Sequence, residues 1–120
     1  MDEKQRRHQR IQASLLMYVE QTDNQGRMRM NTVGQVLNIS EGGILAEMNC
    51  PMDLELESAI VVALGADCLE LRPRLARMER LTPHRYRVAF QIDHRARKAR
   101  TRIAEFVQRR LDTLLPEKAA

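Results

Sequence analysis

A regular alternation of apolar and polar residues near the N-terminus constrains the fold of this chain more than any other feature. From residue 11 to residue 20 every second residue is apolar, and most of the residues between them are polar. A period of two is typical of a β-strand with one buried face. Shorter apolar runs follow, separated by breaks that contain Gly, Pro, Asn or Asp, and they predict further strands. The expected strands are residues 11–20, 28–39, 44–48, 59–64, 68–80 with a bend near Pro73, and 86–92.

The periodicity changes near the C-terminus. Apolar residues there recur three or four positions apart, which predicts one amphipathic helix over residues 94–115. Asp93 is the expected N-cap, and Pro116 ends the helix. Short strands with regular turns, followed by one helix, predict a mainly β fold, an antiparallel barrel with the helix packed against it. The apolar stripe of the helix is Ile103, Phe106, Val107, Leu111, Leu114 and Leu115.

The length of 120 residues fits a single domain. We expect a charged arm at residues 1–10, a barrel at residues 11–92 and a helix at residues 94–115. The arm is expected to be mobile because it has no large apolar residue after Met1. No apolar run approaches the roughly 20 residues that span a bilayer, and no apolar signal segment is present. We therefore expect a cytoplasmic protein without membrane insertion.

The residues that could bind a metal or catalyse a reaction are scattered. Cys50 and Cys68 belong to no CxxC motif, and no histidine is spaced to share a metal with either of them. No Ser, His and Asp arrangement or phosphate-binding loop is visible, and Glu41 has no partner that would make it a base. We expect neither a metal cofactor nor an enzymatic activity.

Two short motifs carry the functional signal. The first has two arginines four residues apart, Arg6 and Arg10, just before the first expected strand. The second, Asn38-x-Ser40-x-x-Gly43, falls on an expected turn between strands. Because the chain contains 17 arginines, a shuffled chain would hold about two matches to the first motif, but only on the order of 0.01 matches to the second. The second motif therefore carries the identification.

Together the motifs resemble the signature of the PilZ family, RxxxR followed some two to three dozen residues later by (D/N)xSxxG, and every defined position matches. The resemblance covers nearly the whole chain and implies a six-stranded antiparallel β-barrel followed by a helix. It also implies a bacterial receptor for the second messenger cyclic di-GMP, with no cofactor besides this ligand. The ligand-binding residues that it implies are Arg6, Arg10, Asn38, Ser40 and Gly43, with Gln5, Arg7 and Gly42 beside them.

Two positions depart from what many relatives carry, and a third bears on ligand stoichiometry. Ala89 and Ile92 occur where many have Gly and Phe, which affects packing more than binding. Gln5 precedes the first motif, at the position that influences whether one ligand or an intercalated pair is bound, and it is neither Arg nor apolar. The resemblance therefore predicts no particular ligand stoichiometry.

The residue types of the motifs suit a cyclic dinucleotide, which offers phosphates and guanines. An arginine can fork onto phosphate oxygens or onto guanine O6 and N7, and it can stack on a purine. Asn38 offers donors and an acceptor to a base edge, and Ser40 can bond phosphate or base. The same residues also suit an ordinary turn, in which Asn38 and Ser40 bond their own backbone and Gly43 has a positive φ. The two roles are compatible.

A basic nucleic-acid-binding or protein-interaction module that does not bind cyclic di-GMP is the alternative. It is motivated by the net charge of +4 and by a basic run on the expected helix. Aromatic residues, which form the stacking platforms for single strands, make up only 3% of the chain, so nucleic acid is the less favoured partner. The basic run is Arg95, Arg97, Lys98, Arg100, Arg102, Arg109 and Arg110.

The mobile arm suggests how binding becomes a signal. We expect the ligand to order the arm across the barrel and so to change the surface that a downstream protein partner meets. The sequence identifies neither that partner nor its pathway, because fold and ligand do not determine them.

Overall fold

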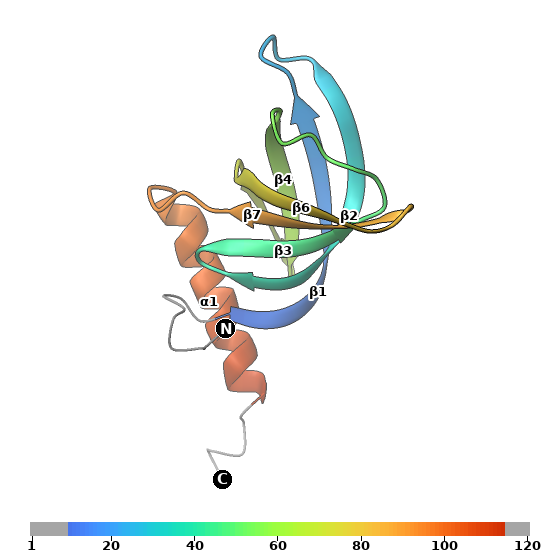
Figure 1. The fold of residues 1–120 in the computed structure, drawn as a ribbon. Coiled ribbons are helices and arrows are strands. Elements are labelled where there is room, and N and C mark those ends of the chain that lie inside the picture. The colour runs from blue at the N-terminus through green and yellow to red at the C-terminus, as the bar shows by residue number, and fades with distance from the viewer. Residues whose placement is uncertain (1–9, 115–120) are drawn as a thin grey trace.

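The computed structural model describes residues 10–114, which form one antiparallel sheet of seven strands followed by a helix (Figure 1). The mainly β fold and the C-terminal helix expected from the sequence are confirmed. The elements are β1 (Arg10–Thr22), β2 (Met28–Ser40), β3 (Gly43–Met48), β4 (Glu57–Leu64), β5 (Asp67–Leu71), β6 (Arg74–Thr82), β7 (Arg85–Gln91) and α1 (Arg97–Leu114).

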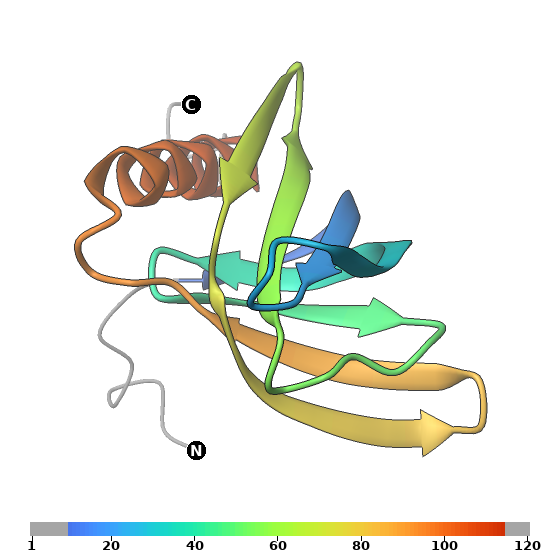
Figure 2. The ribbon, with the colours of Figure 1, turned by 90° about the horizontal axis from the view of Figure 1, so that it is seen from above.

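The sheet is strongly curved but open. Its strand order is β5-β4-β1-β2-β3-β7-β6, and within residues 10–114 no ladder joins the end strands β5 and β6 (Figure 1, Figure 2). The six-stranded barrel of the sequence interpretation is therefore an open barrel of seven strands. The additional strand arises because residues 68–80, expected as one bent strand, form two: β5 pairs with β4, and β6 pairs with β7. Pro73 separates them, since proline has no N–H to donate to a ladder.

One row of apolar side chains crosses five neighbouring strands on the inner face of the sheet. Each member is the direct partner of the next, and all of them are buried. Burying one such side chain contributes roughly 1.5–3 kcal/mol, so this row favours a single register of β1, β2, β3, β7 and β6. We call it the inner row; its members are Ile11, Ile39, Ile44, Phe90 and Leu75.

The helix packs on the sheet through the apolar stripe expected from the sequence. Ile103, Phe106 and Val107 are buried, and Leu111 is partly buried. α1 contacts β1, β2 and β5 and lies beside the end of the sheet where β1 begins (Figure 1). None of the helical structure in residues 10–114 is long and apolar enough to cross a membrane.

The start of the helix differs from the expectation, because Asp93 is not its N-cap. α1 begins at Arg97. The Asp93 carboxylate accepts a hydrogen bond from the backbone N–H of Arg95 at 2.8 Å, and the Asp93 carbonyl accepts one from the N–H of Ala96 at 3.0 Å. Asp93 therefore closes the turn that precedes the helix.

Gly34 on β2 has no room for a side chain. A Cβ atom at this position would overlap the sulfur of Met48 and would lie 3.0 Å from the carbonyl oxygen of Glu47. Met48 is itself buried, so it has little space into which to move. We expect Gly34→Ala to lower the free energy of unfolding by about 1–3 kcal/mol, the usual range for overpacking a core. Urea denaturation followed by circular dichroism measures this change.

A second variant tests the cause. Replacing Met48 by Ala removes the overlapping sulfur, so Gly34→Ala should cost less in the Met48→Ala background than in the wild type. An equal cost in both backgrounds would show that the side-chain overlap is not responsible.

Gln21 is a buried polar side chain that holds the loop between β3 and β4. Its Nε2 donates to the carbonyl of Asp53 at 2.8 Å and to Ser58 Oγ at 3.2 Å, and its Oε1 accepts from the N–H of Asp53 at 2.9 Å. These bonds anchor the loop to the end of β1, because a buried polar group without a partner is costly.

We expect Gln21→Leu to lower the free energy of unfolding by about 2–4 kcal/mol, since it leaves both backbone groups of Asp53 without this partner. Gln35→Leu is the matched control, because Gln35 is exposed on β2, and its effect should stay within about 0.5 kcal/mol. Equal unfolding curves for the two variants would contradict a structural role for Gln21.

Candidate functional site

The second motif lies beside the start of β1. The Cα atoms of Arg10 and Ser40 are direct partners in the β1–β2 ladder, and Ser40 is the partner of Gly43 in the β2–β3 ladder. In the β1–β2 ladder Asn38, two residues before Ser40, pairs with Gln12, two residues after Arg10. The end of the first motif and the whole of the second are therefore adjacent in space, although 28 residues separate Arg10 from Asn38.

The pairing continues across two further strands. Gly43 is the partner of Gln91 on β7, and Gln91 is the partner of Arg74 on β6. Direct partners share one face of a sheet, and neighbours along a strand lie on opposite faces. Because each of these positions adjoins a member of the buried inner row, they form a row on the outer face. We call it the outer row; its positions are Arg10, Ser40, Gly43, Gln91 and Arg74.

A β-bulge in β2 puts Ser40 on this face. Val36 and Ile39 are both buried although they are three residues apart, which the period of two in a regular strand does not allow. The β2–β3 ladder shifts its register between Val36 and Asn38. The extra residue restores the alternation, so that Ile39 faces the core and Ser40 the outer face.

Hydrogen bonds tie the turn between β2 and β3 to its surroundings. Ser40 is only 8% exposed, and its Oγ accepts a hydrogen bond from the N–H of Gly42 at 3.2 Å. The carbonyl of Gly42 accepts one from the N–H of Ile92 at 3.0 Å. The expected bond between Ser40 and its local backbone is thus present, and the turn is also held by the segment that follows β7.

Gly43 is required for a different reason from the one expected. Its φ is not positive, since the positive-φ glycines of the described residues are Gly26 and Gly65. A Cβ atom at Gly43 would lie 2.7 Å from the carbonyl oxygen of Phe90. The close approach of β7, and not the turn itself, excludes a side chain at this position.

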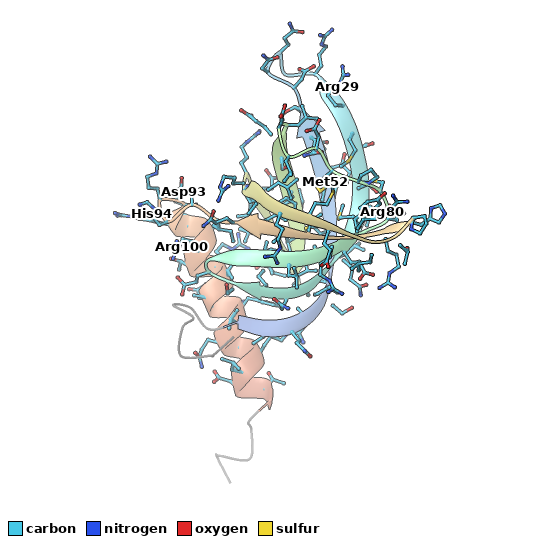
Figure 3. The ribbon with its side chains drawn as sticks, viewed as in Figure 1. Arg29, Met52, Arg80, Asp93, His94 and Arg100 are labelled. Carbon is cyan, nitrogen blue, oxygen red and sulfur yellow. The ribbon has the colours of Figure 1, made fainter. Side chains whose placement is uncertain are left out.

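A cavity of about 550 Å³ opens beside the turn, between the β5–β6 connection and the start of the helix. This is within the 300–1,000 Å³ typical of small-ligand sites. Figure 3 shows Asp93, His94 and Arg100 at this end of the molecule, whereas Arg80 lies at the opposite end. The lining residues include Gly42, Arg72, Arg74, Gln91, His94 and Arg95.

Two carboxylates near the cavity are engaged by arginines. Asp93 accepts from Arg95 Nε at 3.2 Å and from Arg95 Nη2 at 2.9 Å. These bonds lower the pKa of Asp93 to about 2, so it is ionised at neutral pH. Glu41 Oε1, in the turn, lies 3.9 Å from Nε of Arg100 on α1. This ion pair links the second motif to the helix.

The described residues contain part of the expected site. Asn38 and Ser40 lie at the end of β2, Gly42 lies in the turn and Gly43 begins β3, with the backbone of Arg10 beside them. The remaining expected residues, Gln5, Arg6 and Arg7, lie outside the described residues.

Sequence reasoning missed Arg72, Arg74 and Gln91. They belong to no motif, and only the strand pairing and the cavity bring them to the turn. Seventeen arginines gave no reason to single out two of them.

The candidate metal ligands are scattered in the structure, as they are in the sequence. Residues 10–114 contain no group of three or more His, Cys, Asp or Glu side chains that could hold a metal ion. Cys50 and Cys68 are both free thiols.

Several solved structures share this fold. The PilZ domain of YcgR from Escherichia coli, solved with c-di-GMP, has a TM-score of 0.64 at 19% identity, with 96% of this chain and 97% of that chain covered. A larger YcgR structure from the same organism, in complex with c-di-GMP, has a TM-score of 0.68 at 18% identity, with coverage of 96% and 49%. The motility inhibitor MotI/DgrA of Bacillus subtilis has a TM-score of 0.67 at 14% identity, with coverage of 89% and 51%.

These likenesses establish the fold, and the chain spans only about half the length of the last two proteins. A search of curated proteins gave no match. The sequence model of the PilZ domain matches residues 4–109, a range that includes both motifs and all seven strands. The chain therefore belongs to the PilZ domain family.

Proposed function

We propose that the chain is a receptor for cyclic di-GMP, which binds between the two motifs. The observation that carries the proposal is the direct pairing of Arg10 with Ser40 and of Ser40 with Gly43, which joins the two motifs in the outer row. The YcgR structures support the choice of ligand, since both contain c-di-GMP.

Each expected residue has a role in this proposal. Arg6 and Arg10 bind phosphate oxygens and guanine edges through their guanidinium groups. Asn38 bonds a base edge. Ser40 Oγ accepts from the N–H of Gly42, which leaves its hydroxyl hydrogen free to donate to the ligand. Gly43, without a side chain, lets the ligand approach the backbone.

Gln5, Arg7 and Gly42 flank the contacts and help to shape the site. Residues 1–120 act together as one binding domain, with the arm at residues 1–10, and the chain acts through binding and not through catalysis.

A nucleic-acid-binding function has weaker support. Tyr86, Phe90 and Phe106 are buried, so they are not available for stacking with bases. Arg102 on the basic helix lies 3.5 Å from Asp67, which partly offsets its charge.

Binding becomes a signal if it fixes the arm. In this proposal the ligand holds Arg6 and Arg10 against the turn, which orders the residues that precede β1 across the outer face and alters the surface presented to a downstream protein. The arm has no large apolar residue after Met1 that could hold it without the ligand.

Calorimetric titration tests the ligand and the site. We expect the wild type to bind cyclic di-GMP and to bind GTP, cyclic di-AMP and single-stranded DNA much more weakly. Arg6→Ala, Arg10→Ala and Ser40→Ala should each weaken binding tenfold or more, because each removes a hydrogen bond to a charged or polar ligand group.

Arg29→Ala is the matched control, since Figure 3 shows Arg29 on the β1–β2 hairpin, far from the turn. It should bind like the wild type. A folded wild-type protein that does not bind cyclic di-GMP would refute the proposal, and preferred binding of single-stranded DNA with steep salt dependence would favour the alternative.

Hydrogen exchange tests the ordering of the arm. Cyclic di-GMP should slow exchange of the backbone amides of residues 2–9, while the amides of β1 to β7 that face neighbouring strands change little. The Ser40→Ala protein, titrated with the same ligand concentration, should show less protection. Equal protection of the arm with and without ligand would contradict the switch, even if binding is observed.

A further inference from the structure

The outer row extends past the two motifs to Arg74. Gln91 and Arg74 are the fourth and fifth positions of this row, and the side chain of Arg74 donates a hydrogen bond to Oε1 of Gln91. Both residues also line the cavity that Gly42 borders. The surface beside the turn therefore continues into a cavity that is lined by Arg72 and Arg74 on the side away from Gly42.

The charges around this cavity are not balanced. Arg95 is held by Asp93, and Arg100 lies 3.9 Å from Glu41. In contrast, the hydrogen-bond partner of Arg74 is a neutral amide. The side chain of Arg72 forms neither a hydrogen bond nor an ion pair with any residue from 10 to 114, although it is exposed at the cavity.

The positions of these arginines suit a ligand that lies along the row. Neighbouring strands are about 4.8 Å apart, so Arg74 is roughly 10 Å from Gly43 and roughly 19 Å from Arg10 along the curved sheet. At one end of the row, the long side chain of Arg74 can reach inward toward a compact ligand over Ser40 and Gly43. A planar guanidinium suits a phosphate group in particular, because it offers parallel N–H donors in a fixed geometry.

We propose that Arg72 and Arg74 form a second cationic clamp, which binds a phosphate group of the cyclic dinucleotide on the side of the turn opposite to Arg10. This inference rests on the proposed function and adds ligand-binding residues that lie in neither motif. Gln91 acts as a positioning residue, since its bond to Arg74 directs that guanidinium along the outer row.

Calorimetric titration of the full chain with cyclic di-GMP tests the clamp. Arg72→Gln and Arg74→Gln should each weaken binding about tenfold without changing the melting temperature of the free protein, because each removes a charge-assisted hydrogen bond. Arg72→Lys keeps the positive charge but loses the planar pair of N–H donors. Its affinity should therefore fall between those of the wild type and Arg72→Gln.

Arg80→Gln is the matched control, because it removes the same charge from β6 at the end away from the cavity (Figure 3). Its affinity should stay within twofold of the wild type. Added salt should also weaken binding less steeply in Arg72→Gln than in Arg80→Gln, since one phosphate contact is missing.

Three results would overturn the clamp, and they can be told apart. If Arg72→Gln and Arg74→Gln bind like the wild type while Ser40→Ala is impaired, the clamp is wrong and the proposed function stands. If Arg80→Gln weakens binding as much as they do, the effect comes from overall charge and not from a clamp. If the folded wild type does not bind cyclic di-GMP, the clamp and the proposed function fail together.

Discussion

The register of five strands is the constraint on which the rest of the structure depends. Side chains alternate between the two faces, so the ladders that bury the inner row also align the outer row. Shifting one strand by a single residue would expose its inner-row residue and bury a polar one. The apolar residues of the inner row thus determine the positions of the outer-row residues, because the same ladders align both rows.

The site also depends on local departures from a regular sheet. The bulge in β2 returns Ser40 to the outer face after Val36 and Ile39 have both faced the core. The absence of a side chain at Gly43 lets β7 approach within a distance that a Cβ would prevent. Through the Gly42 to Ile92 hydrogen bond, the turn is coupled to the segment that leads into the helix.

Much of the fold could be predicted because period two and period 3.6 are visible in the residue order. The expected strands and helix occur, and within residues 10–114 their ends differ from the expected ones by at most three residues, apart from the division of residues 68–80. Residues 68–80 form two strands and not one, because a proline between two strands of one sheet looks in sequence like a bend within one strand. The prediction that Asp93 caps the helix is also wrong, because Asp93 closes a separate turn that precedes the helix.

The sequence by itself determined the family, through Asn38, Ser40 and Gly43, and most of the strand and helix pattern. These are local properties, since a motif and a periodicity depend only on the order of nearby residues. Only the tertiary structure decided that Arg74 and Gln91 share a row with Ser40 and that Arg72 lines the same cavity. That arrangement depends on which strands pair and in which register, and pairing between distant segments is settled by the joint burial of the inner row.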